Sequence, residues 1–149
     1  MNPAHMQQLR PIRDCFAELP LPTRDFCQGV FTARFIGPAW LRHVARPSIA
    51  ISGMPGWKGK RFLSPDRAIN VLEWRGGSHE RLIMRCEESA SRVDGKPALA
   101  FVYGNNAPMP WRWIREEFRV LDSRTLLAMT IIDLPLLRRL SFPFLLERG

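Results

Sequence analysis

Residues 81–95, RLIMRCEESASRVDG, decide the fold class. Apolar Leu82, Met84 and Cys86 share one face of an extended segment, and Arg81, Arg85 and Glu87 lie on the other, so one face is apolar and the other mainly polar. This period of two predicts a β-strand with one packed face and one solvated face. Asp94-Gly95 then supplies the dipeptide that favours a tight hairpin turn. The stretch therefore predicts a long strand that reverses into an antiparallel neighbour.

Similar short apolar or alternating segments, separated by turn signals, lie on both sides of this stretch. Several such strands predict a sandwich or a closed barrel, and a count of about eight favours a barrel able to hold one small ligand. Closure also removes the exposed edges of an antiparallel sheet. The expected strands span residues 25–36, 58–63, 67–74, 79–93, 97–103, 111–121, 125–134 and 143–148.

Two segments have helical character. Within residues 11–19, Ile12, Cys15, Phe16 and Leu19 recur at the spacing of one helical face. Residues 40–44 predict one or two further turns, and the Pro- and Gly-containing residues 47–57 predict a loop. We therefore expect a mainly β, antiparallel barrel in a single domain over residues 1–149, with an N-terminal helical segment over 1–22 and a short helical cap.

Composition narrows the classes of partner. The 149 residues carry 22 basic and 14 acidic side chains, a net charge of +8, and the arginines are dispersed along the chain. Such a surface favours acidic ligands and anionic membranes without demanding them. No RNA-binding signature is present, so nucleic acid is an unlikely partner. Three cysteines without a CxxC spacing indicate neither a disulfide framework nor a metal site.

The N-terminal segment and the apolar stretches indicate where in the cell the protein is expected. The N-terminal segment lacks the pattern of a secretory signal, and no run of eighteen apolar residues predicts a spanning helix. We therefore expect a cytoplasmic protein with reduced thiols. Residues 134–146 are apolar around Arg138-Arg139. They predict either a loop packed on the barrel or a peripheral contact with an anionic membrane.

Several motifs occur in a fixed order along the chain: WKGKRF at 57–62, Tyr103 before a loop, FRVLD at 118–122, TLL at 125–127 and PFLLER at 143–148, after a degenerate GVFTA at 29–33. In order and spacing they resemble a bacterial family of small lipocalin-like proteins named for a Gly-x-Trp-x-Gly motif. The resemblance implies a lipocalin-like barrel and no particular reaction or cofactor.

These patterns predict a ligand-binding set. Trp57 either borders a cavity or plugs the barrel end, and Lys60 would face an acidic ligand group. If Phe118 faces the lumen, Arg119 faces out, because the strand period is two. The full expected set is Trp57, Lys60, Phe62, Leu82, Met84, Tyr103, Trp111, Trp113, Phe118, Arg119, Leu127 and Met129.

Binding of a small hydrophobic or amphipathic molecule is the function that this pattern favours. One alternative is a cofactor-free isomerase or cyclase that uses Glu88 or Tyr103 as acid or base, since a carboxyl in an apolar lumen has a raised pKa. Another is a basic adaptor for nucleic acid or a membrane surface, because Trp111 to Arg115 interleave aromatic rings with cations. No metal or cofactor is expected.

Overall fold

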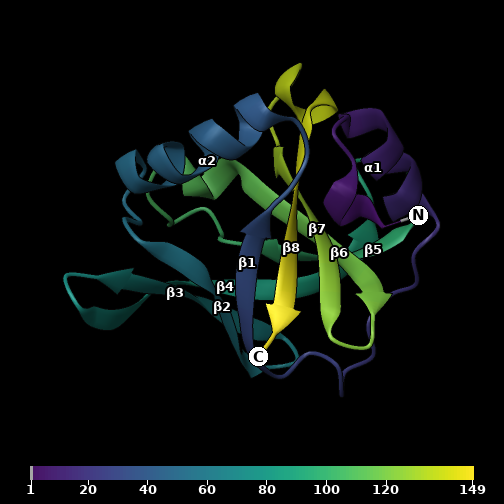
Figure 1. Ribbon diagram of the computed structural model, residues 1–149. Coiled ribbons are helices and arrows are strands. Elements are labelled where there is room, and N and C mark those ends of the chain that lie inside the picture. The colour runs from purple at the N-terminus through teal and green to yellow at the C-terminus, as the bar shows by residue number, and fades with distance from the viewer. Residues whose placement is uncertain (1) are drawn as a thin grey trace.

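The computed structural model describes residues 2–149 and contains a closed, eight-stranded antiparallel β-barrel (Figure 1). The expected mainly β barrel with an N-terminal helix and a helical cap is therefore confirmed. The strands are β1 (Gly29–Phe35), β2 (Trp57–Ser64), β3 (Arg67–Trp74), β4 (Gly77–Ala90), β5 (Pro97–Val102), β6 (Ile114–Asp122), β7 (Thr125–Ile132) and β8 (Ser141–Arg148).

Each strand pairs with the next along the chain, and β8 returns to pair with β1. This up-and-down order alternates the connections between the two ends of the barrel. The end that carries α2 and the β5–β6 and β7–β8 connections is called the upper end below (Figure 1). Because the barrel closes, no strand edge is left open to pair with another chain.

The first helix covers the outside of the barrel. Helix α1 (Leu9–Ala17) follows a short 3₁₀ turn, η1 (Pro3–His5), and buries Ile12 and Phe16. These side chains form a second apolar cluster with residues of β7 and β8, among them Leu127 and Leu145. Helix α1 therefore adds a layer outside the sheet and does not enter the lumen.

The second helix corrects the prediction of a loop over residues 47–57. Helix α2 (Ala39–Ile51) runs through Pro47 and ends only at Ser52. A proline removes one helical hydrogen bond, here the bond to the carbonyl of His43. His43 and Pro47 are both exposed, so water can reach this part of the helix. The loop prediction was wrong for residues 47–51, where solvent reduces the usual penalty of a proline inside a helix, while residues 52–56 form the connection to β2.

Residues 111–113 correct the predicted start of the sixth strand. They form a 3₁₀ turn, η2 (Trp111–Trp113), and β6 begins only at Ile114. The amide of Trp111 donates to the carbonyl of Pro108, and that of Trp113 to the carbonyl of Pro110. Turn bonds thus replace ladder bonds before the strand starts. A third turn, η3 (Leu137–Arg139), lies in the β7–β8 connection.

One close contact between strands depends on a glycine. A Cβ added at Gly59 in β2 would lie 2.0 Å from the backbone oxygen of Phe31 in β1. The pairing of β2 with β3 is also irregular between Trp57 and Gly59. The glycine of the WKGKRF segment therefore allows β1 to approach β2 where the barrel wall bends.

Within residues 2–149, neither helix has the length and apolar character needed to cross a lipid bilayer.

Candidate functional site

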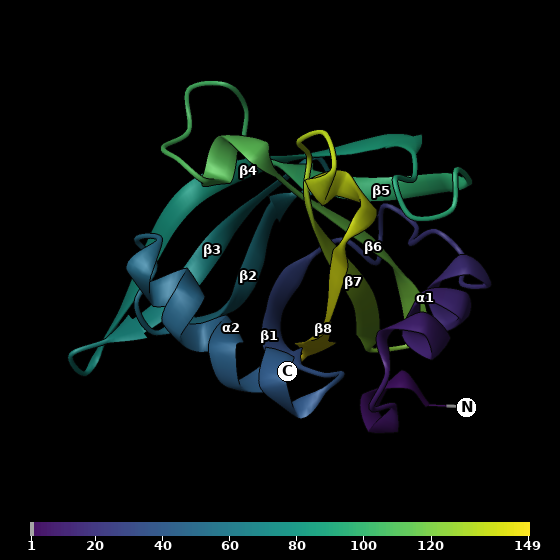
Figure 2. The same cartoon turned by 90° about the horizontal axis from the view of Figure 1, so that it is seen from above.

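An apolar groove opens at the upper end of the barrel. It has a volume of about 310 Å³ and lies between α2 and the upper parts of β7 and β8. Leu41, Ala45 and Ile49 line it from the helix, and Ile132 and Phe142 line it from the strands. Helix α2 lies across this end in the side view, and the view from above shows α2 and the yellow β7–β8 connection on the side that faces the viewer (Figures 1 and 2). The helix thus forms one wall of the groove.

A smaller cavity of about 70 Å³ continues the groove into the barrel. The two spaces share four lining residues: Phe35, Ile49, Thr130 and Phe144. Trp57 and Trp111 also line this cavity, and Glu116 is the charged residue in its lining. A carboxylate therefore lies close to the groove, separated from it by the shared residues.

Glu116 forms a buried ion pair. Its Oε2 lies 2.8 Å from Nζ of Lys60, whose side chain is fully buried, while that of Glu116 is 6% exposed. Lys60 is on β2 and Glu116 on β6, so the pair crosses the lumen. The ammonium also lies 5.0 Å from the ring centre of Phe101 and 5.4 Å from that of Trp57. Aromatic faces thus add to the stabilisation of this charge.

Three neutral polar side chains complete the cluster. Asn70 Oδ1 accepts from Lys60 Nζ at 2.8 Å and from Trp57 Nε1 at 3.0 Å. Asn70 Nδ2 donates to the Tyr103 hydroxyl at 3.1 Å, and that hydroxyl donates to Glu116 Oε1 at 3.4 Å. Four strands therefore hold the ion pair in place, with Met84 Sδ 3.2 Å from the ammonium.

The pKa values of the cluster follow from its burial. Desolvation lowers the pKa of Lys60, and the nearby Glu116 carboxylate opposes this effect. Desolvation and the charge of Glu116 both raise the pKa of Tyr103 well above its ordinary value. The phenol is therefore protonated at neutral pH and acts as a hydrogen-bond donor to Glu116.

One atom of the cluster has spare hydrogen-bonding capacity. Among residues 2–149, Glu116 Oε2 has only the Lys60 ammonium as a partner, at 2.8 Å, so it can accept further hydrogen bonds. Buried carboxylate oxygens usually accept several hydrogen bonds. Since Glu116 lines the inner cavity, a hydroxyl or amide placed there has an acceptor available.

Below the polar cluster, aromatic rings fill the barrel. Phe101 and Phe118 stack with ring centres 4.3 Å apart. Phe62 contacts both rings, and Phe31 packs edge-on against Phe62 at 5.7 Å. This aromatic layer closes the lower lumen, so the free space is at the upper end.

The structure brings part of the predicted set together. Trp57 and Trp111 line the inner cavity, and Lys60 and Tyr103 lie in the polar cluster beneath it. Leu82 contributes its carbonyl, which accepts from Asn70, and packs against the core with Met84. Phe62 and Phe118 belong to the aromatic layer and do not line the cavity.

Five predicted positions lie elsewhere. Leu127 and Met129 face outward beneath α1, because Leu126 and Ala128 take the inward positions of β7. Arg119 also faces outward, where its guanidinium stacks on Phe16 at 4.3 Å.

The other two are Glu88 and Trp113. Glu88 is exposed near the end of β4, so the desolvation expected of a catalytic carboxyl is missing. Trp113 lies in η2, where the shorter helical period takes it off the face of Trp111, and Arg112 covers its ring.

Sequence reasoning missed Glu116 and Asn70. The signal for Glu116 was present, since a period of two places it on the same face of β6 as Phe118. Asn70 shares the face of Ala68 and Leu72 in β3, all three being buried. A polar residue at an inward position of a strand is the pattern that identifies both.

The buried thiols do not form part of a nucleophilic site. Burial raises the pKa of Cys27 to about 11 and that of Cys86 to about 12. Both thiols are therefore protonated and poorly nucleophilic at neutral pH.

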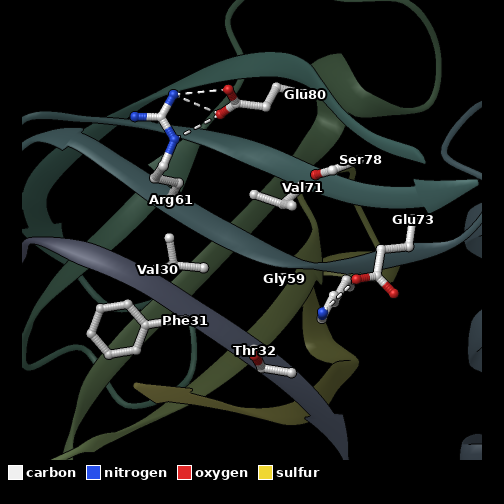
Figure 3. Close-up of a pocket in the computed structure, with 10 residues that line it drawn as sticks. Val30, Phe31, Thr32, Gly59, Arg61, Val71, Glu73, Ser78 and Glu80 are labelled. Carbon is white, nitrogen blue, oxygen red and sulfur yellow. Dashed lines mark hydrogen bonds and ion pairs between the residues drawn. The ribbon is translucent and has the colours of Figure 1, made fainter. Parts of the chain in front are cut away.

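A second hollow, of about 370 Å³, lies outside the barrel wall on β1, β2, β3 and β4 (Figure 3). Its floor contains Val30, Gly59 and Val71, and the Arg61 and Glu80 side chains pair across it at 2.7 Å (Figure 3). Lys58 likewise pairs with Glu73 outside this wall. These charges satisfy each other, so the groove beneath α2 is the better candidate site.

Comparison with known proteins adds evidence on the fold. No protein-family model and no curated protein matches the sequence. Among solved structures, the chain is similar to a protein from Thermomonospora curvata, with 20% sequence identity and a TM-score of 0.69. The match covers 97% of this chain and 89% of the other. At this identity the similarity shows a shared fold.

Proposed function

We propose that the protein binds one small, largely apolar molecule whose polar end is a neutral hydrogen-bond donor. The apolar part occupies the groove beneath α2, and the donor reaches Glu116 Oε2 through the inner cavity. The observation that carries this proposal is a buried carboxylate beside the cavity: Glu116 lines the cavity, and among residues 2–149 its Oε2 has only the Lys60 ammonium as a partner. A ligand hydroxyl supplies a further hydrogen bond.

The charge of the cluster favours a neutral head group. Lys60 is already paired with Glu116, so the pair has no net charge to offer a ligand carboxylate. A carboxylate beside Glu116 would meet a like charge in a poorly solvated cavity. A neutral hydroxyl or amide does not experience this repulsion.

The size of the groove limits the ligand. Small-molecule sites commonly span about 300–1,000 Å³, and the groove of about 310 Å³ is at the lower end of this range. Its lining is almost entirely apolar, so an unbranched or single-ring hydrocarbon body with one polar end matches it.

Titration calorimetry with 1-decanol and decanoate tests the choice of head group on a common chain. We expect decanol to bind and decanoate to bind at least about tenfold more weakly at neutral pH. Equal affinity for the two compounds would contradict the assignment of Glu116 as the head-group partner.

A pair of α2 variants tests the location. Ala45 lines the groove, so Ala45→Trp fills it and should abolish decanol binding. His43→Trp places the same ring on the exposed side of α2 and should bind as the wild type does. Thermal melts check that both variants are folded. Binding that survives in Ala45→Trp, or is lost equally in both variants, rejects the groove.

A further inference from the structure

Exposed apolar side chains gather around the groove at the upper end. Helix α2 presents Trp40, Val44 and Ile51, of which Ile51 is 88% exposed. With the exposed Pro47 they follow a spacing of four, three and four residues, which is one helical face. Trp40 and Val44 also line the groove, so the apolar side chains of α2 extend from the groove to the exposed Ile51.

The neighbouring connections extend this apolar surface. Met109 is 57% exposed in the β5–β6 connection, and Leu136 is 80% exposed in the β7–β8 connection, where Leu137 and Leu140 are also exposed. The view from above shows both connections and α2 on the side that faces the viewer (Figure 2). We call these side chains the apolar rim: Trp40, Val44, Ile51, Met109, Leu136, Leu137 and Leu140.

The same three segments are strongly basic. Residues 36–56, 103–113 and 133–140 contain five arginines and a single acidic residue, Asp133. All five guanidinium groups belong to exposed residues: Arg42, Arg46, Arg112, Arg138 and Arg139. The connections at the other end, residues 65–66, 91–96 and 123–124, are nearly balanced, with three basic and two acidic side chains. The positive charge is therefore concentrated where the apolar rim lies.

We propose that the apolar rim and its arginines dock the upper end of the barrel on an anionic lipid bilayer. An amphipathic helix with exposed Trp and Ile and flanking arginines has the features of segments that lie in the membrane interface. The apolar side chains enter the boundary of the acyl region while the arginines contact anionic head groups. The groove then faces the lipid from which an apolar ligand would enter.

A bilayer fits this surface better than a second copy of the chain. Two copies placed rim to rim would bring ten arginines and two aspartates together, and like charges oppose such contact. Nucleic acid would neutralise the arginines, but its phosphates leave the exposed leucine and isoleucine side chains in water. An anionic membrane satisfies both the charge and the apolar surface.

Co-sedimentation with vesicles tests the proposal. We expect binding to vesicles of 30% phosphatidylglycerol in phosphatidylcholine to exceed binding to pure phosphatidylcholine on the order of tenfold or more, since each nearby arginine adds about 1 kcal/mol. A rise in salt from 0.05 to 0.5 M should weaken this preference. Failure to bind the anionic vesicles, or equal binding to both kinds, would overturn the proposal.

Matched double variants distinguish vesicle binding through the apolar rim from non-specific binding by other exposed apolar side chains. Ile51→Ser/Leu136→Ser removes two rim residues that do not line the groove, and should lower anionic-vesicle binding on the order of tenfold. Val30→Ser/Ile83→Ser removes two exposed apolar side chains from the barrel wall and should change it less than twofold. Equal effects of the two variants reject the rim as the docking surface.

Charge variants and two further measurements test whether nucleic acid or a second copy of the chain binds this surface instead. Arg112→Gln/Arg139→Gln should weaken vesicle binding, whereas Arg67→Gln/Arg124→Gln, exposed at the other end of the barrel, should not. A duplex RNA that binds more tightly than anionic vesicles at equal phosphate would assign the arginines to nucleic acid instead. A dimer in sedimentation velocity that Ile51→Ser/Leu136→Ser abolishes would assign the rim to a second copy. These tests do not depend on whether decanol binds in the groove.

Discussion

Lys60 places a charge in the most apolar part of the molecule. Burial of an ammonium is costly, and the Glu116 carboxylate repays this cost only in part, which agrees with the lowered pKa of Lys60. A barrel built for stability alone would fill this layer with hydrocarbon. Mutation can therefore separate the effect of the ion pair on the stability of the protein from its effect on ligand binding.

A double-mutant cycle makes this separation. Lys60→Met leaves Glu116 buried without its counter-charge and should lower the free energy of unfolding by about 3–5 kcal/mol. Lys60→Met/Glu116→Gln removes both charges and should return within about 1–2 kcal/mol of the wild type. Urea unfolding of the wild type, Lys60→Met, Glu116→Gln and the double variant completes the cycle and measures both values.

The same cycle has a binding readout. The double variant should be folded yet bind decanol less tightly, because the carboxylate acceptor is gone. If the double variant is as unstable as Lys60→Met, the charges do not compensate each other. If it binds decanol as the wild type does, the pair is structural only.

At the scale of elements, the contact between β1 and β2 leaves no room for a side chain at Gly59. Gly59→Ala puts a methyl group 2.0 Å from the Phe31 backbone oxygen, so the strands must separate. We expect a loss of at least about 3 kcal/mol in the free energy of unfolding, measured by urea denaturation. The control is Gly77→Ala, whose nearest contact is a flexible His79 nitrogen at 3.4 Å. A Gly59→Ala protein as stable as this control would refute the steric account.

Most strands could be predicted from the sequence, because alternation and turn dipeptides are local signals. The predicted segments 58–63 and 67–74 match β2 and β3 to within a residue at each end. Helix α2 could not be predicted in full, because its continuation past Pro47 depends on where solvent meets the helix. The 3₁₀ turn at Trp111 depends on hydrogen bonds to two prolines, which the period of two does not reveal.

The candidate site was predictable only in part, for a geometric reason. Lys60, Tyr103 and Trp57 belong to motifs, but their partner Glu116 comes from a strand on the far side of the lumen. Closure of the barrel brings these strands together, and the register that faces Glu116 inward is a tertiary property. Leu127 and Met129 were predicted to face inward but face outward. Their strand is almost wholly apolar, so no polar face indicates its orientation, and α1 covers the side on which they lie.

At the scale of the whole molecule, Arg119 joins the helix, a loop and the barrel. Its guanidinium donates to the Phe16 carbonyl of α1, to the carboxylate of Asp94 and to the Pro97 carbonyl. Desolvation raises the pKa of Asp94, but hydrogen bonds from Arg119 and the Lys96 amide outweigh it, so the pKa is lowered. The outer layer therefore depends on an ionised Asp94.

This dependence predicts acid sensitivity. Because the pKa of Asp94 is lower in the folded state, its stabilisation is fully present above the ordinary value of 3.8 and is lost as the pH falls through the folded value. We expect Asp94→Asn to be less stable than the wild type at pH 7 by about 1.5–3 kcal/mol and to converge with it as the pH falls through the lowered pKa of Asp94. Urea unfolding at several pH values measures this. Asp14→Asn, an exposed carboxylate on α1, should leave the acid limb unchanged. Parallel curves for Asp94→Asn and the wild type would contradict the assignment.

The aromatic layer beneath the polar cluster closes the barrel below the inner cavity, so the cavity has no exit at the lower end. A guest cannot pass through the barrel, so arrival and departure use the same portal beside α2. A substitution that makes α2 more mobile without changing the stability of the complex should raise the association and dissociation rate constants by the same factor. The dissociation constant then stays the same. Under the proposed function, α2 therefore sets the residence time of the ligand, while Glu116 sets its selectivity, and the two properties can evolve independently.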